Sequence, residues 1–313
     1  MDIFNSRKKF FLTALFFYII VMLIASFADL SLSNVFANPG SIFGTVFQNF
    51  GLFSQAAICL ISGQIIIAWA LRSDRLLYEK TTLIIGGIAL GLWQLWGYLK
   101  STISYNLTTL LNIHQHKAIG LANSDAATAH LSQGINITLT LVIFILVTVA
   151  AQLWLKNKNA EELNYLIKAA VIAVLIVVLN DTVNSTMKQY WGRVRPYELN
   201  SAQSNFTPWF HINGADGHLS FPSGHSESAA LSFVLGLFIS RKNYRLQRGW
   251  FIGSLIYAFL MAISRVRVEA HFLSDTMTGL FTTFLIISII LSATGLHLVE
   301  RVSQKKDGAS GSL

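Results

Sequence analysis

The stretch SRVRVEAHFLSD, residues 264–275, lies between two apolar runs, GWFIGSLIYAFLMAI at 249–263 and TMTGLFTTFLIISIILSATGL at 276–296. A helix that crosses a bilayer needs about 20 mostly apolar residues, so the second run is long enough and the first only if its helix continues. The stretch between them holds two arginines, a glutamate, a histidine and an aspartate, in a chain that is only 12% charged. It therefore predicts a short polar connection between two membrane helices.

The composition of the whole chain agrees with a membrane protein. Of its 313 residues 53% are hydrophobic, the mean hydropathy is +0.53, and a soluble domain carries roughly twice this charged fraction. We predict an all-α fold, a polytopic bundle of about eight transmembrane helices. The predicted spans are Phe10–Ala28, Leu52–Leu71, Thr81–Leu99, Ile135–Leu155, Leu166–Leu179, Phe221–Ser240, Trp250–Ile263 and Thr276–Val299. The fifth and seventh reach spanning length only if their helices extend into the polar residues that follow.

The placement of lysine and arginine predicts the orientation. Most of the 23 basic residues fall before the first predicted span and in alternate loops after it, and the positive-inside rule makes that side the cytoplasm, with both termini there. The net charge of +8 is spread loop by loop in this way, so it does not indicate a nucleic-acid partner. The remaining basic residues concentrate in two outer loops, where topology alone does not require them.

Three motifs fall at this predicted outer face: KQYWGRVRP at 188–196, FPSGHS at 221–226, and the opening stretch at 264–275. Lys188, Arg195 and Arg265 offer one point charge and two planar forks, which suit the several oxygens of a phosphate group. At the helix start predicted after Pro222, the free N–H groups of Gly224 and His225 would bind an anion.

Two histidines complete the predicted site. His271 and Asp275 are four residues apart and share a face if both lie on a helix, so the carboxylate can accept one ring proton and leave the other nitrogen with a lone pair. Such a histidine can attack phosphorus. His225, from a different loop, can then protonate the departing oxygen.

In these residues the sequence resembles the type 2 phosphatidic acid phosphatases, which share their site with vanadium haloperoxidases. The signature of that superfamily, K-x6-RP, PSGH and SR-x5-H-x3-D, is matched in order and without a gap. The resemblance implies that His271 is the nucleophile, Asp275 its orienting partner and His225 the general acid. The residues that it implies for phosphate binding are Lys188, Arg195, Arg265, Ser223 and Gly224. It implies no metal and no cofactor, in agreement with a single cysteine, Cys59, and no carboxylate cluster.

The family usually has six core spans, which predicts three parts for this chain: a two-helix N-terminal addition at 1–80, a phosphatase core at 81–301 and a disordered cytoplasmic tail at 302–313. Three further residues are possible accessories. Arg193 and Arg267 flank the cationic group and either extend it to a second phosphate or contact lipid headgroups. Asp181 either orients Lys188 or serves local polarity only.

The leading hypothesis is an integral-membrane phosphatase that acts on a phosphorylated lipid at the outer face of a bacterial plasma membrane. Phosphatidic acid, phosphatidylglycerol phosphate and polyprenyl diphosphate all fit, and the extra arginines favour a carrier-lipid diphosphate by a small margin. A phosphotransferase using the same phosphohistidine is a second possibility. A membrane transporter is a third, although the charges cluster at one face and not at the midplane.

Overall fold

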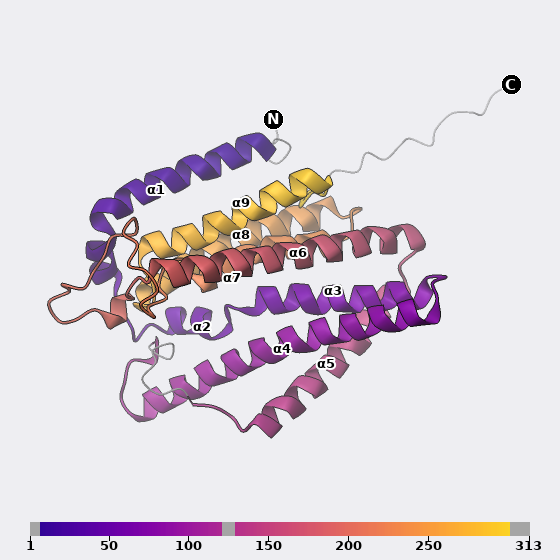
Figure 1. The fold of residues 1–313 in the computed structure, drawn as a ribbon, viewed down its shortest axis with the longest axis horizontal. Helices are drawn as coiled ribbons and strands as arrows, with labels where there is room; N and C mark the ends of the chain where they lie inside the picture. Colours follow the sequence, from indigo (N-terminus) through magenta and orange to yellow (C-terminus); the bar gives the residue numbers. More distant parts are fainter. Residues whose placement is uncertain (1–6, 121–128, 301–313) are drawn as a thin grey trace.

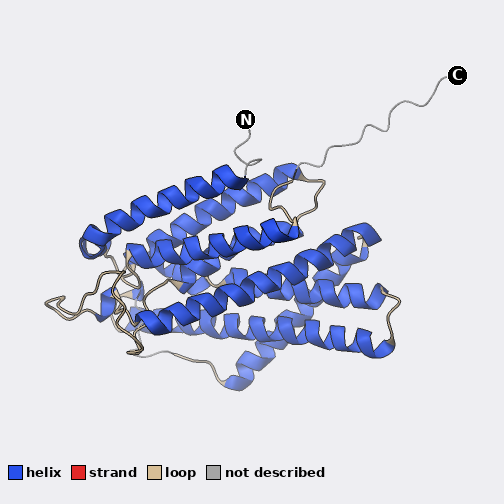
Figure 2. Ribbon diagram, turned by 45° about the horizontal axis from the view of Figure 1, so that its top comes forward, coloured by secondary structure: helices blue, strands red, loops and turns tan. Residues whose placement is uncertain are grey.

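The computed structural model describes residues 7–120 and 129–300, and every regular element in that part of the chain is a helix (Figure 1 and Figure 2). The predicted all-α bundle is therefore confirmed. In chain order the elements are α1 (Arg7–Phe36), α2 (Ile42–Phe50), α3 (Phe53–Arg72), α4 (Leu77–His114), α5 (Gln133–Lys156), α6 (Ala160–Trp191), η3 (Pro196–Glu198), α7 (Gly224–Leu235), η4 (Gly236–Phe238), α8 (Tyr244–Arg267) and α9 (Leu273–Thr294). The predicted disordered tail, 302–313, lies outside the described residues.

Seven helical segments in the described residues are long and apolar enough to cross a membrane, with α2 and α3 counted together. The two spans that looked short are long because their helices do continue into polar sequence. Helix α6 runs on to Trp191 and α8 to Arg267, so each carries a cationic motif at its end.

The structure corrects one of the eight predicted membrane spans, Phe221–Ser240. Its helix α7 has 12 residues, about 18 Å at the usual rise, and only the single turn η4 follows. Residues 225–238 are all buried, against α3, α6, α8 and α9, so this helix packs inside the bundle and presents no face to lipid. The apolar run was read as a membrane span because burial in protein and burial in lipid select the same side chains.

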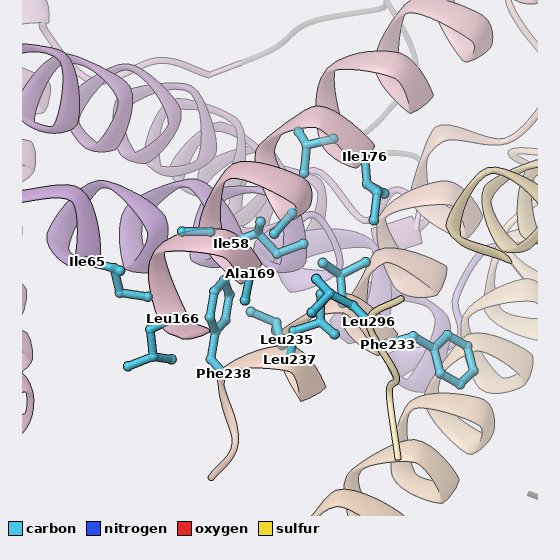
Figure 3. Packing of buried hydrophobic residues seen from close by; sticks show 14 of the residues in the cluster. Ile58, Ile65, Leu166, Ala169, Ile176, Phe233, Leu235, Leu237, Phe238 and Leu296 are labelled. Carbon is cyan, nitrogen blue, oxygen red and sulfur yellow. The ribbon is translucent and has the colours of Figure 1, made fainter. Parts of the chain in front are cut away.

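The main core lies between α3, α6, α7 and the end of α9 (Figure 3). Ile58 and Ile65 of α3 pack there with Ala169 of α6 and Leu231 of α7, all fully buried. Small residues bring the helix backbones close together. At Gly63 of α3, a Cβ atom would meet the main-chain oxygen of Gly87 in α4 at 2.4 Å, so this helix crossing requires glycine.

The N-terminal helices are part of the same bundle. Helix α1 packs along α9, α2 packs on α8 and α4, and α3 shares the main core with α6 and α7. The short helix α2 was not anticipated from sequence. The proposed boundary at residue 80 stays a prediction, but the residues before it lie close to the predicted site, as the next section describes.

Candidate active site

The three predicted motifs meet at one end of the bundle. Lys188 lies in the last turn of α6, His225 in the first turn of α7, and Arg265 in the last turn of α8. Direct hydrogen bonds join them: the Lys188 ammonium group donates to the Pro222 carbonyl, and Ser223 N–H donates to the Asp275 carbonyl at 3.0 Å. The expectation that distant segments form one site is met by this geometry.

His271 does not sit on the helix that was expected to carry it. Helix α9 begins at Leu273, so His271 lies in the loop before it, while Asp275 is in the first turn. The ring nitrogen Nδ1 of His271 is 3.6 Å from Asp275 Oδ2, longer than an ordinary hydrogen bond. The two side chains are neighbours as predicted, but the reason is the loop and not a shared helix face.

The Asp275 carboxylate is held by other donors. Its Oδ2 accepts from the Phe272 main-chain N–H at 2.9 Å and from the Ser220 hydroxyl, and its Oδ1 accepts from Arg193 Nη1 at 2.6 Å. Phe272 N–H is one of the unsatisfied donors at the start of α9, so Asp275 also caps that helix. These bonds fix the carboxylate in place beside His271.

Arg193 belongs to this support and not to a second phosphate site. It is fully buried, and its guanidinium bonds Asp275 on one side and Asp29 of α1, at 2.9 Å, on the other. Ser274 donates its hydroxyl and its main-chain N–H to Asp29 and completes the network. Sequence reasoning had read Asp29 as a helix-end residue, because nothing in the sequence near it indicates a partner 164 positions away.

Burial lowers the pKa of His271 well below its ordinary value, against the opposing effect of Asp275, and the positive charges of Arg195 and Lys188 lower it further. The ring is therefore neutral at neutral pH. Its second nitrogen, Nε2, is 3.4 Å from Arg195 Nη1. With the ring proton on Nδ1, facing Asp275, the lone pair of Nε2 is available among the cations.

The three predicted phosphate ligands lie close enough together for their charges to interact, and two of them, Arg195 and Lys188, also act on His271. The Lys188 ammonium group donates to the carbonyls of Leu219 and Pro222, and Arg195 donates to the carbonyls of Leu219 and Ala270. Arg265 is fully buried. Holding like charges together in a buried place is costly unless an anion binds among them, so the cluster is suited to a phosphate group.

The start of α7 adds main-chain donors. Ser223 is the N-cap and accepts from Ser226 N–H, which leaves the N–H groups of the first helical residues available for an anion. A Cβ atom at Gly224 would meet only the Lys188 side chain, at 3.8 Å. A Cβ atom at Gly279 of α9 would meet the main-chain oxygen of Ser223 at 2.4 Å, so only glycine at this position lets α9 pack against the start of α7.

His225 has a different kind of partner from His271. Its Nε2 lies 3.0 Å from the main-chain oxygen of Gln48 in α2, and because a carbonyl only accepts, the histidine donates there. Burial lowers the pKa of His225 well below its ordinary value, and the positive charge of Arg265 adds to this effect. Gln48 was missed from sequence, since an amide in an apolar segment gives no signal of its own.

The other accessory residues lie apart from the phosphate cluster. Arg267 donates from Nε to the hydroxyl of Ser41, the N-cap of α2, so it fastens α2 to the end of α8. Asp181 is exposed and forms no hydrogen bond with Lys188 in the described residues, which corrects the idea that it orients that lysine. The preceding residue, Asn180, faces inward and donates to Glu227 of α7 at 2.9 Å.

Comparison with known proteins agrees with the site. Residues 169–297 match the family model described as the PAP2 superfamily, and the segment contains all three motifs. The match confirms, over these residues, the resemblance noted from sequence.

One similar characterised protein is phosphatidylglycerophosphatase B of Bacillus subtilis (strain 168), which is 27% identical over 124 residues. The match covers 38% of this chain and 55% of that protein, so the chain spans about half the length of this relative. No solved structure matches. Asp29 and Gln48 both lie outside the segment that the family model covers.

Proposed function

We propose that this protein is an integral-membrane lipid phosphatase that releases phosphate through a covalent phosphohistidine at His271. One observation carries the proposal: a buried histidine lies beside Arg195 and Lys188, with Arg265 close to both of these cations, at the end of an apolar helical bundle. A phosphate needs such a cluster, and a lipid needs such a bundle, because its phosphate sits at the membrane surface while its tail stays in the bilayer.

In the proposed first step, His271 Nε2 attacks phosphorus and the bond from phosphorus to the lipid oxygen breaks. The electron pair of that bond goes to the lipid oxygen, which takes a proton from His225. The negative charge of the bound phosphate offsets the burial and positive charge that lower the pKa of this histidine, so that the ring carries a second proton in the complex. In the second step water attacks the phosphohistidine, His225 accepts the proton of the water, and the bond from phosphorus to nitrogen breaks. Lys188, Arg195 and Arg265 neutralise the phosphate oxygens in both steps, with the main-chain donors at Ser223 and Gly224.

We place the site at the outer face of the membrane and both termini in the cytoplasm. The basic loops that follow α3, α5 and α7 support this orientation by the positive-inside rule, because they lie at the end of the bundle opposite to the three motifs (Figure 1). A bacterial plasma membrane is the proposed location.

A lipid phosphomonoester is the proposed substrate class, with phosphatidylglycerol phosphate as the first to test. The relative named above is a phosphatidylglycerophosphatase, which supports this choice. Arg193 is bound to Asp29 and Asp275 and is not free to hold a second phosphate, so the extra arginines give less support to a diphosphate substrate. Polyprenyl diphosphate therefore becomes the comparison substrate.

The test is a phosphate-release assay with purified protein in detergent, over phosphatidylglycerol phosphate, phosphatidic acid and polyprenyl diphosphate. We expect the wild type to release inorganic phosphate and the His271→Ala variant to release none above background. Detergent removes the compartments that transport needs, and the appearance of free phosphate separates hydrolysis from transfer to another acceptor. A His271→Ala protein with wild-type rates on every lipid would refute the mechanism.

A further inference from the structure

Helix α2 contacts residues of the candidate site, although it lies outside the segment that the family model covers. Its N-cap Ser41 accepts from Arg267 at the end of α8. Its residue Gly44 lies against that same end, where a Cβ atom would come within 3.4 Å of the Ser264 oxygen and still closer to the Val268 side chain. The helix is therefore placed beside Arg265 by close packing.

Gln48 of α2 touches two of the three motifs. Its side-chain oxygen Oε1 accepts from Arg265 Nη1 at 2.9 Å, and its main-chain oxygen accepts from His225 Nε2 at 3.0 Å. The residue is fully buried. One glutamine thus connects the arginine of the cationic cluster with the histidine assigned to proton transfer.

The other half of the Gln48 amide is an unused donor. A guanidinium can only donate, so the amide atom facing Arg265 is the oxygen, and this identifies the remaining atom as the nitrogen Nε2. Nε2 is buried and has no hydrogen-bond partner among the described residues. A buried donor without an acceptor is unfavourable, and an anion bound at Arg265 would supply an acceptor.

We propose that Gln48 is a phosphate-binding residue: its Nε2–H donates to a phosphate oxygen held by Arg265, while its Oε1 fixes the orientation of that guanidinium. The identity of the ligand as a substrate phosphate rests on the proposed function. Inorganic phosphate, the released product, presents the same oxygens and serves as the probe.

The neighbouring residue, Asn49, is a matched control. It is also a buried amide of α2, but it donates to Asn106 and Thr109 of α4, each at 3.2 Å, on another side of the helix. Asn49→Leu removes a buried amide from the same helix without removing a contact to Arg265 or His225. Any loss that follows only from disturbing α2 should appear in this variant as well.

The experiment measures the Kd for inorganic phosphate by calorimetry on the purified full-length protein, with the unfolding temperature of each variant as a check on folding. Gln48→Met keeps the volume and removes the donor, and we expect phosphate binding to weaken about tenfold, as for the loss of one hydrogen bond to a charged group. Gln48→Glu keeps an acceptor for Arg265 but turns a carboxylate oxygen toward the phosphate, so it should weaken binding more than Gln48→Met. Asn49→Leu should leave the Kd unchanged.

The proposal is overturned if Gln48→Met binds phosphate as the wild type does, if Gln48→Glu binds it as well as the wild type, or if Asn49→Leu weakens binding equally. A role confined to anchoring Arg265 predicts that Gln48→Glu is the milder change. Lipid hydrolysis by the same preparations tests the proposed function separately. Phosphate binding that depends on Gln48 in a protein that hydrolyses no lipid phosphate would remove the proposed function and leave this inference standing.

Discussion

The two histidines of the site have the same side chain and similar burial, but different supports. His271 lies beside the Asp275 carboxylate, which Arg193 and Asp29 hold through a network of buried charges. His225 donates to a neutral main-chain carbonyl, that of Gln48. A charged partner stabilises a ring on which positive charge develops during attack. A neutral partner gives no such stabilisation, so a ring that takes up a proton only when the phosphate anion is bound gives it up readily. The difference in support matches the proposed division between nucleophile and acid.

The largest effect that tests this division is on the covalent intermediate. With a substrate labelled in its phosphate, we expect rapid acid-free quenching to trap labelled protein in the wild type and none in His271→Ala, which should also lose at least about 10⁴-fold in kcat/KM. The label should survive in His225→Ala, because attack on phosphorus precedes the second use of that residue. Label on His271→Ala protein would assign the nucleophile elsewhere.

His225→Ala should cost about 10²- to 10⁴-fold in kcat on a lipid substrate, the usual contribution of a general acid. On p-nitrophenyl phosphate the loss should be much smaller, since that leaving group needs no proton. Measuring both substrates side by side isolates proton transfer from general damage to the site. An equal loss on both would remove His225 from the role of acid.

Asp29→Asn tests the charged support of His271. Removing one charge from the buried network leaves Arg193 with a single carboxylate, and breaking a buried ion pair typically costs about 3–5 kcal/mol of stability. We expect a clear fall in the unfolding temperature and a lower kcat, with the p-nitrophenyl phosphate and lipid substrates affected alike. Asp181→Asn, on an exposed face of α6, is the control and should change neither quantity.

The smallest effect is that of pH. Burial and nearby positive charge lower the pKa of His271, so its neutral form persists at pH values where a free histidine is protonated. We expect kcat/KM to stay level as the pH falls through about 6.5, the ordinary histidine pKa, and to decline only in more acidic solution. A decline centred at or above pH 6.5 would contradict the buried, neutral nucleophile.

The lowered pKa values of the two histidines also predict how the stability of the protein depends on pH. Because the unfolded chain takes up a proton on each histidine near pH 6.5 while the folded sites stay neutral, stability should fall as the pH drops below that value. Unfolding temperatures at pH 7.5 and 5.5 check this expectation. His271→Gln should show a smaller difference between the two pH values than the wild type.

The parts of the site that could be predicted either lie close together in the sequence or contain residue types that are typical of their local structure. Lys188 with Arg195, and His271 with Asp275, are separated by a few residues, so in each pair a helix end and the loop next to it bring both members together. The start of α7 was readable because Ser223 and Gly224 open helices for local reasons. What failed was also local: Asp181 has the helical spacing to lie on the same side of α6 as Lys188, but its side chain is exposed, and the lysine ammonium group donates to the carbonyls of Leu219 and Pro222.

Taken alone, the sequence determined an all-helical membrane fold, the resemblance to a family and the positions of three motifs, because hydrophobic runs and short spacings act over a few turns of chain. Only the tertiary structure decided that α7 is an internal helix, that Arg193 supports Asp275, and that Asp29 and Gln48 enter the site. Gln48 is 217 positions from the arginine it contacts. Such a pair forms because whole helices pack against each other, and the free energy of that packing is spread over side chains far from the site.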